Sequence, residues 1–506
     1  MASLAKKSAW SAAGSMISVL GRLCSAVIVA RLLGPRGVGQ LAFLTWVCES
    51  MYVLSNRGLS SGLTRYIAEL HGGGRSAGIP VLTKWVYKLC FVACVPGSAF
   101  LAAFLWFHGS TLHEYGSLLT CTILFAYVLT FFANVKIAEY TGMHRFRDLA
   151  VVNAISAIIL IAGQFVGTIF LGLTGAVVGY ALSSLPLALL VLWVINPMPR
   201  GEVPPQTLKR QFLNYSKNAW IGQIVSAVVW GRIEVFFIER YCGSHEVGLF
   251  SAALTLASIA IYGPVWLRGA FLPHFADLQG AGDRESIERA YIAGTRVMAL
   301  IAFPLGLGGA AIVPVLLPLL YGDAFASAAP MAAVLTGLAC LTFGGVGSAL
   351  VYGIGYSRFV ALVEAAAAIA SITASFLIIP SYGAWGAVWV RVGLQSTIIL
   401  FQTLYISLGL KYGVPYGDIL KTSCAAAACG AIAWGAVAVL PQGASIPVAV
   451  CLGAATYGVC GRLLGAIKTE DLQRAAGGLR VISATGRPWT GSVNSFLSAV
   501  RNGRNK

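Results

Sequence analysis

Long apolar stretches separated by short polar segments extend along almost the whole 506-residue chain. Two of them, residues 149–199 and 422–461, contain no Asp, Glu, Lys or Arg. One membrane-spanning helix needs about 20 apolar residues, so each stretch is long enough for two helices. Gly-Leu-Thr at 172–174 and Pro-Gln-Gly at 441–443 supply the turns. Strands of a membrane barrel would alternate apolar and polar positions, and the sequence has no such alternation. We therefore expect an all-α polytopic membrane protein.

The apolar segments predict fourteen transmembrane helices. Their expected bounds are 10–33, 38–64, 80–106, 116–138, 149–171, 174–195, 216–239, 246–272, 291–320, 325–354, 358–380, 384–408, 416–440 and 444–466. The first segment is too long for the apolar region of a signal peptide, so we take it as the first helix. We expect an N-terminal six-helix lobe at 1–195, a cytoplasmic linker at 196–215, a C-terminal six-helix lobe at 216–410, two additional helices at 411–466 and a basic cytoplasmic tail at 467–506.

The two lobes are expected to be copies of one repeat, because short motifs recur in the same order along the chain. Three of the matching pairs are Gly-Arg at 21–22 and 231–232, ARLLGPRGVG at 30–39 with ERYCGSHEVG at 239–248, and GLTGAVV at 172–178 with GAWGAVW at 383–389. The separation between the copies stays near ~210 residues, which is difficult to explain without an internal duplication. Both copies run in the same direction, so the repeats are parallel.

Charge is scarce but strongly biased, with 10% charged residues and a net charge of +17. If the N-terminus is cytoplasmic, most of the 35 Lys and Arg fall on the cytoplasmic side of the predicted spans. This positive-inside pattern reports orientation and contact with anionic membrane lipids, and it argues against nucleic acid as a partner. An even number of spans also returns the C-terminus to the cytoplasm. We expect a multi-pass protein of the bacterial inner membrane with both termini cytoplasmic.

Arginines interrupt four of the apolar spans, at Arg22, Arg57, Arg232 and Arg268. A charge at the bilayer centre costs about 2.5–3.5 kcal/mol on insertion scales, and such residues normally face the protein interior or a watery cavity. A guanidinium holds two phosphate oxygens with its planar fork and stays charged when partly desolvated. We interpret the four arginines as the lining of a water-filled cationic cavity suited to phosphate oxygens. Purely structural roles stay open as alternatives. Arg22 and Arg232 could each pair with a carboxylate on another helix and so hold the two helices together. Arg57 and Arg268 could extend their charged ends to the cytoplasmic surface of the membrane.

Two acidic residues, Glu49 and Glu234, are expected to be the only well-buried acids. A rise of 1.5 Å per residue puts Arg22 about 18 Å, and Glu49 about 16 Å, from the outer ends of consecutive helices. Because the two side chains lie at the same depth, we expect an ion pair between them. Arg232 and Glu234 are two residues apart on one predicted helix and do not face each other.

Several features argue against catalysis. The predicted outer loops are too short for the polar domain that a polymerase or ligase of lipid-linked sugars needs. The sequence has no Walker A motif and no His or Cys pair with zinc spacing, so we expect no cofactor, no metal and no catalytic residue. Pro304, Pro314 and Pro318 interrupt the ninth span. Such breaks are tolerated where neighbours or water satisfy the backbone, and they mark bending points.

The segments ARLLGPRGVGQLAF, from residue 30, and NRGLSSGLTRYIAEL, from residue 56, resemble the start of polysaccharide-biosynthesis flippases of the Wzx type. These belong to the multidrug/oligosaccharidyl-lipid/polysaccharide (MOP) exporter superfamily. The resemblance implies outward translocation of undecaprenyl-diphosphate-linked oligosaccharide, by alternating access, for O-antigen, capsule or exopolysaccharide. It also implies that Arg22, Arg57 and Arg268 line a central cavity, as arginines of the related lipid II flippases do, so that the cationic cavity would bind the diphosphate. Coupling to a proton or sodium ion is a further implication, and Glu49 and Glu234 are the candidates for it. A polysaccharide polymerase and a chain-length regulator are the protein partners it suggests.

Three other functions remain alternatives at this point. A lipid II flippase and a multidrug exporter of the same superfamily would share the fold. Drug exporters of this kind commonly bind cations with carboxylates in the first helix, whereas the segment between Lys6 and Arg31 contains none, which favours an anionic substrate. A membrane polymerase or ligase is the alternative from a different class.

Overall fold

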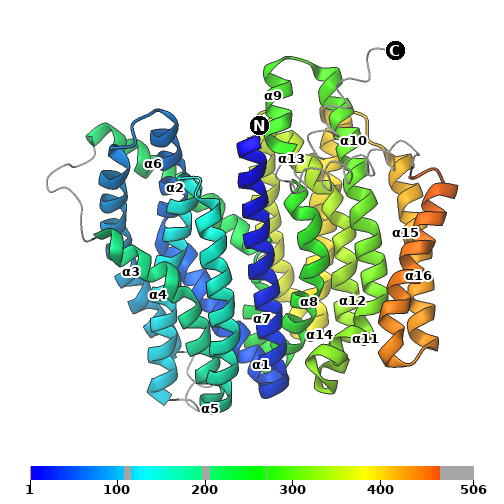
Figure 1. Cartoon of the computed structure of the whole chain (residues 1–506), viewed down its shortest axis with the longest axis horizontal. Coiled ribbons are helices and arrows are strands. Elements are labelled where there is room, and N and C mark those ends of the chain that lie inside the picture. The colour runs from blue at the N-terminus through cyan, green and yellow to red at the C-terminus, as the bar shows by residue number, and fades with distance from the viewer. Residues whose placement is uncertain (1, 108–115, 196–204, 269–270, 468–506) are drawn as a thin grey trace. The chain divides into compact units, whose positions relative to one another are not determined.

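The computed structural model describes residues 2–107, 116–195, 205–268 and 271–467, and within these ranges the chain forms helices and no strand (Figure 1). The chain divides into two compact units, Met1–Gly248 and Leu249–Lys506. These are called the first and the second unit. The prediction of an all-α polytopic protein is confirmed.

The first unit is formed by α1 (Ala2–Asn56), α2 (Leu59–Gly72), α3 (Gly78–Phe107), α4 (Gly116–Gly142), α5 (Phe146–Ile195), α6 (Gln206–Val229) and α7 (Glu234–Cys242). It also includes the first residues of α8 (Ser244–Arg268).

The second unit contains the rest of α8, then α9 (Phe271–Gly280), α10 (Arg284–Phe303), the π-helix η1 (Pro304–Gly308), α11 (Gly309–Tyr321) and the 3₁₀-helix η2 (Asp323–Ala328). It continues with α12 (Ala329–Gly337), the 3₁₀-helix η3 (Leu338–Gly344), α13 (Gly345–Gly353), α14 (Ser357–Leu404), the π-helix η4 (Tyr405–Gly409), α15 (Tyr416–Val439) and α16 (Gln442–Leu463).

Three helices are each long enough to cross the membrane twice. The helices α1, α5 and α14 contain 55, 50 and 48 residues, and a straight helix of that length would extend about 70 Å or more, against a hydrocarbon core of about 30 Å. Each is broken at one glycine with positive φ: Gly34 (68°), Gly172 (56°) and Gly383 (56°). Glycine adopts this backbone conformation without steric cost, so it is the residue that makes these turns possible.

The two arms of α5 pack against each other through glycines. A Cβ on Gly175 would lie 1.7 Å from the carbonyl oxygen of Gly167, and a Cβ on Gly163 would lie 3.0 Å from the Cα of Gly179. The paired positions move away from Gly172 in both directions, so the arms run antiparallel. Small residues allow this close approach of two backbones, which is a common way to join helices in a membrane.

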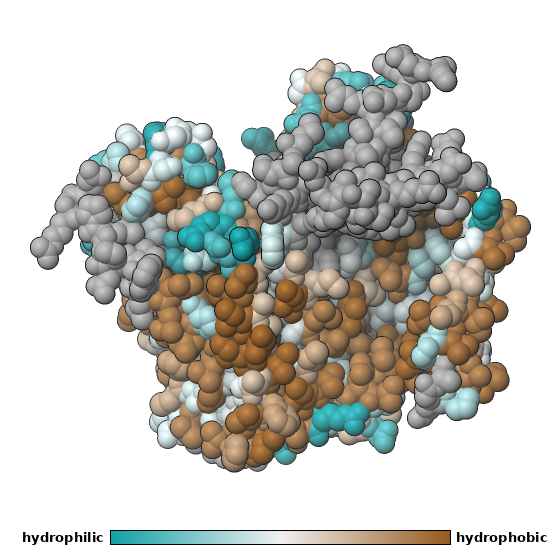
Figure 2. Space-filling view, in the orientation of Figure 1, coloured by the Kyte–Doolittle hydropathy of each residue, from teal (hydrophilic) through white to brown (hydrophobic). Residues whose placement is uncertain are grey.

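Ten stretches within the described residues are long and apolar enough to span a membrane, and α6 with α7 forms one further, bent span. If each of the three helices broken at a glycine counts as two spans, the fourteen predicted helices are recovered. Large apolar side chains such as Val92, Phe170, Val439 and Leu463 are exposed on the outside of the helices. On the face shown in Figure 2, such side chains cover the sides of the helices, as expected for a surface in contact with lipid.

The seventh predicted helix differs from the prediction. The sequence indicated one continuous helix at 216–239, whereas α6 begins at Gln206 and is followed, after a break at 230–233, by α7 at an angle of 49°. α6 packs on α1 and α2: the indole nitrogen of Trp220 donates to the carbonyl oxygen of Val53 at 2.9 Å. The first helix of the second repeat therefore lies in the first unit.

Equivalent residues of the two repeats also meet within the first unit. A Cβ on Gly39 would lie 1.7 Å from the carbonyl oxygen of Ser244, and a Cβ on Gly248 would lie 1.8 Å from that of Pro35. Gly39 corresponds to Gly248 in the repeat, and Pro35 corresponds to Ser244. The contact is therefore reciprocal, and both glycines are required for it.

Candidate functional site

The candidate site lies in the first unit, around the carboxylate of Glu49. Glu49 belongs to the second arm of α1, and its side chain is accessible to solvent although protein surrounds it on all sides. Arg232 and, more weakly, Arg22 lie within electrostatic range of the carboxylate. The ion pair expected between Arg22 and Glu49 stays a prediction, and the depth argument did not include Arg232. The first repeat contributes Arg22 and Glu49, and the second contributes Arg232.

Local structure explains how each arginine reaches this place. Gly21 packs directly on α5, because a Cβ there would lie 2.7 Å from that of Ala157. The neighbouring Arg22 is exposed. Arg232 lies in the break between α6 and α7, where the backbone leaves the helical path. Glu234 is 2% exposed and begins α7. Arg232 and Glu234 were predicted to share one continuous helix, and in the structure they do not.

Tyr180, on the second arm of α5, was not recognised from the sequence. It lies within electrostatic range of Glu49 and Arg22 and forms a side-chain hydrogen bond with Thr130. The hydroxyls of Thr130 and Ser184 are 3.3 Å apart. Uncharged hydroxyls leave little trace in a hydropathy pattern. The available signal was the pair Tyr180 and Ser184, which are four residues apart and so lie on one face of an otherwise apolar helix.

Arg57 and Arg268 are placed differently from the predictions. Arg57 was expected inside a helix at 38–64, but α1 ends at Asn56, and Arg57 has a positive φ of 51° in the break before α2. Its side chain is exposed. The side chain of Asn56 closes this break, accepting from the backbone N–H of Ser60 at 3.1 Å. Arg268 is the last residue of α8, in the second unit, and its side chain lies outside the described residues. The roles of these residues stay predictions.

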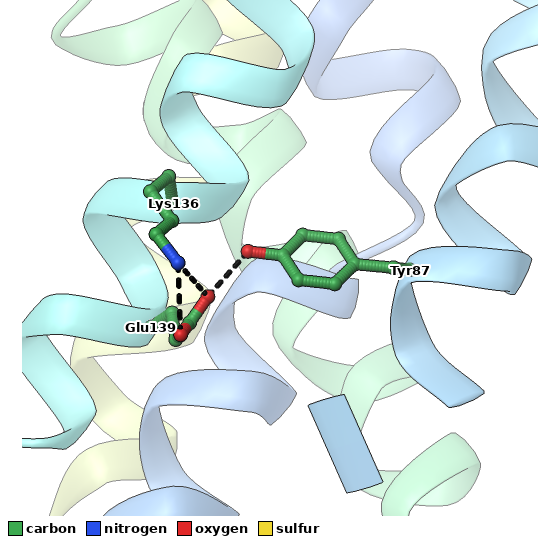
Figure 3. A network of polar contacts seen from close by, with 3 residues as sticks. All are labelled: Tyr87, Lys136 and Glu139. Carbon is green, nitrogen blue, oxygen red and sulfur yellow. Dashed lines mark hydrogen bonds and ion pairs between the residues drawn. The ribbon is translucent and has the colours of Figure 1, made fainter. Parts of the chain in front are cut away.

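A second charged cluster is completely enclosed by the helices of the first unit (Figure 3). Lys136 donates to both carboxylate oxygens of Glu139, at 3.0 and 2.9 Å, and the Tyr87 hydroxyl donates to the same carboxylate. Lys136 and Glu139 have 2% and 4% side-chain exposure. Lys136 also stands 5.1 Å from the ring centroid of Tyr140, a cation–π contact. All of these groups are satisfied by each other, so the cluster joins α3 to α4.

This cluster corrects the expectation that Glu49 and Glu234 are the only well-buried acids. The sequence placed Glu139 just beyond the end of a helix at 116–138, whereas α4 continues to Gly142. Lys136 and Glu139 are three residues apart, a spacing that brings opposite charges together on a helix. That spacing was the signal in the sequence.

No group of three or more His, Cys, Asp or Glu in the described ranges could hold a metal ion. Spans broken at glycines, together with one bent span, define the class of the protein: it is a helical multi-pass membrane protein.

Two solved structures share this fold. One is the lipid II flippase MurJ in its inward closed conformation, with a TM-score of 0.70 and 12% identity, over 89% of this chain and 97% of that one. The other is an inward-facing multidrug resistance MATE family transporter of the MOP superfamily, with a TM-score of 0.65 and 16% identity, over 78% of this chain and 96% of that one.

Residues 28–330, more than half of the chain, match the model of a family described as polysaccharide biosynthesis protein. The protein belongs to this family. It is also similar to the lipid III flippases of Escherichia coli (strain K12) and Shigella flexneri, with 28% identity over 232 residues in each case. The match covers 43% of this chain and 50% of each relative, so the chain spans about half the length of these curated relatives.

Proposed function

We propose that the protein is a flippase that moves undecaprenyl-diphosphate-linked oligosaccharide units across the bacterial inner membrane, for the synthesis of O-antigen, capsule or exopolysaccharide. Its family supports a role in polysaccharide biosynthesis. Relatives and fold neighbours named as lipid III and lipid II flippases support a lipid-linked substrate. We propose an orientation in the membrane in which both termini are cytoplasmic. A polysaccharide polymerase and a chain-length regulator are the proposed protein partners.

The observation that carries the proposal is the electrostatic link of Arg232 and Arg22 to one exposed carboxylate. Two guanidiniums around a single carboxylate leave an excess of positive charge, which suits a diphosphate. A hydrogen bond to a charged group contributes about 1.5–3 kcal/mol. Each arginine can donate two such bonds to a diphosphate, so exchanging the Glu49 carboxylate for the diphosphate as the partner of both arginines is favourable. Arg57 and Arg268 are proposed as further contacts of the diphosphate or its leading sugar.

The exchange of partners gives Glu49 a role in coupling. When the diphosphate takes over Arg232 and Arg22, the Glu49 carboxylate loses its counter-charges and becomes easier to protonate. Alternating access needs such a ligand-dependent difference between states, because a ligand that binds both states equally shifts nothing. Proton uptake at Glu49 would supply the difference. Glu234 is the second candidate for this step.

The test is polysaccharide export by cells that depend on this protein, together with flipping of a fluorescent undecaprenyl-diphosphate sugar in proteoliposomes. Arg22→Ala and Arg232→Ala should each reduce transport about tenfold to a hundredfold, the loss expected for one charged hydrogen-bonding partner. Arg22→Lys and Arg232→Lys should restore it only in part, because an ammonium lacks the bidentate fork. Arg147→Ala, at an exposed position on α5, is the control. Normal transport by the double alanine variant, correctly inserted in the membrane, would rule out the cationic site.

A further inference from the structure

Pro304 interrupts the backbone hydrogen bonding of α10 as that helix passes into η1. In a regular α-helix the carbonyl oxygen of Leu300 would accept a hydrogen bond from the N–H at position 304. Proline has no N–H, and its ring pushes that carbonyl aside. Leu300 lies within the membrane-span candidate Arg284–Tyr321. Lipid offers no donor in place of the lost one, so the oxygen needs a partner from the protein.

Tyr457 of α16 supplies this partner. Its hydroxyl donates to the carbonyl oxygen of Leu300 at 2.8 Å. α16 is one of the two helices that lie outside the internal repeat, and the side chain of Tyr457 is half-buried. The additional helices are therefore connected to the backbone oxygen that the proline deprived of its usual donor.

Other contacts lie around the same interruption of the helix. The thiol of Cys340, in η3, donates to the carbonyl oxygen of Phe303 at 3.8 Å. One helical turn before Leu300, Arg296 donates to the carbonyl oxygen of Ala466, just after α16, at 3.1 Å. α15 approaches at Gly430, where a Cβ would lie 3.0 Å from the carbonyl oxygen of Leu307. Groups from η3, α15 and α16 thus surround the residues between Leu300 and Gly308.

We propose that α15 and α16 act as a brace for this proline-interrupted span, and that Tyr457 is a positioning residue that completes the backbone hydrogen bonding at Pro304. The brace allows the second unit to keep this interruption in a lipid environment, where an unpaired carbonyl would otherwise loosen the helix. This assigns a structural function to the two additional helices that goes beyond the flippase proposal and does not depend on it.

Hydrogen exchange of the intact protein in lipid nanodiscs tests the proposal without any substrate. In Tyr457→Phe, amides of residues 301–303 and 305–309 should exchange about threefold to tenfold faster, which corresponds to the loss of one hydrogen bond of about 0.6–1.4 kcal/mol. The matched control is Tyr52→Phe, which removes a tyrosine hydroxyl bonded to Ser60 at 2.9 Å in the first unit. This control should leave exchange at these amides unchanged.

A double-mutant cycle identifies the cause. Pro304→Ala restores the N–H that the Leu300 carbonyl lacks, so Tyr457→Phe should have little effect on exchange in the Pro304→Ala background. Equal effects in both backgrounds, or no effect of Tyr457→Phe in the native background, would overturn the proposal. If Pro304→Ala does not fold, the decision falls on Tyr457→Phe and its control: faster exchange confined to 301–309 supports the brace, and faster exchange throughout the second unit contradicts it.

Transport gives a second measurement, which rests on the proposed function. Tyr457→Phe should slow flipping, and Pro304→Ala should remove most of the difference between Tyr and Phe at position 457. If none of the variants or the native protein transports the lipid-linked sugar, the flippase proposal fails while the exchange experiment still decides the role of Tyr457.

Discussion

The first and second units differ in where each departs from a simple bundle of apolar helices. Four ionisable side chains are buried among the described residues: Lys136, Glu139 and Glu234 lie in the first unit, and Arg391 lies in the second. The second unit instead contains η1, η3 and η4, which interrupt its α-helices. Segments of π- or 3₁₀-helix in the middle of a span are typical of places that bend. Buried ionisable side chains are thus concentrated in the first unit, and interruptions of the α-helices in the second.

The boundary between the two units does not coincide with the boundary between the two sequence repeats. α6 and α7 come from the second repeat but belong to the first unit, where Arg232 lies within range of Glu49. A charged site composed of both repeats is therefore assembled inside one unit. Sequence repeats tell which residues are equivalent, and they do not tell which residues pack together.

The largest effect on stability is expected from Lys136. Lys136→Ala leaves the Glu139 carboxylate and the Tyr87 hydroxyl buried without the ammonium, which should lower the free energy of unfolding by about 3–5 kcal/mol. The double variant Lys136→Met, Glu139→Gln removes both charges and keeps an acceptor for Tyr87, so it should recover most of the loss. Unfolding of the purified protein in nanodiscs measures both. A single variant as stable as the native protein would contradict the view that the first unit depends on its buried charges.

A smaller difference is expected between the hairpins of the two units. Gly175→Ala would force a Cβ to 1.7 Å from the carbonyl oxygen of Gly167, whereas at Gly386, in α14, the nearest atom would be 3.0 Å away. The first substitution should separate the arms of α5 and cost about 1–3 kcal/mol as overpacking, and the second should cost less. Thermal unfolding of the two variants, side by side, checks the order. The reverse order would mean that the arms of α14 are the more tightly joined pair.

Glu49→Gln should affect transport more than stability, because the side chain is exposed. The variant should still bind lipid-linked substrate, since Arg22 and Arg232 remain. Flipping should slow about tenfold, which corresponds to a loss of about 1.4 kcal/mol in the free-energy difference between the states of the transport cycle. Flipping should also lose its response to a pH gradient. Transport measured in proteoliposomes with and without the gradient separates this from a purely structural role. A native pH response in the folded variant would remove Glu49 from the coupling step.

The smallest effect is expected from the exposed pair Arg145 and Asp148. The two residues have the same spacing of three as Lys136 and Glu139, and the Nη2 atom of Arg145 lies 2.5 Å from the Oδ2 atom of Asp148. Their side chains, however, are 52% and 43% exposed. Arg145→Ala should change the free energy of unfolding by less than about 1 kcal/mol, because water already solvates both charges. Comparison with Lys136→Ala shows whether the loss of unfolding free energy depends on the burial of a charge pair rather than on the number of charges.

The sequence was sufficient for the parts of the fold that composition and repetition control. Apolar length predicted fourteen spans, and the turns expected at 172–174 and 441–443 agree with the break of α5 at Gly172 and with the junction between α15 and α16. The break at 230–233, which contains Arg232, was missed because no proline marks it and the apolar segments on both sides are consistent with one continuous helix. Glu139 was missed because the end of a span is poorly defined by hydropathy. Tyr180 and Tyr457 act through single hydroxyls whose partners are distant in the sequence.

The reciprocal contact of Gly39 and Gly248 has the form of an isologous interface, in which each partner presents the same patch to the other. Such an interface is what a symmetric homodimer makes between two identical chains, and here both sides belong to one polypeptide. In a homodimer every substitution appears on both sides of the axis at once. In a fused chain each side can change alone, and the equivalent positions 180 and 391 now hold Tyr180 and Arg391. A duplicated chain can therefore hold different side chains at equivalent positions, which a symmetric homodimer of identical chains cannot do.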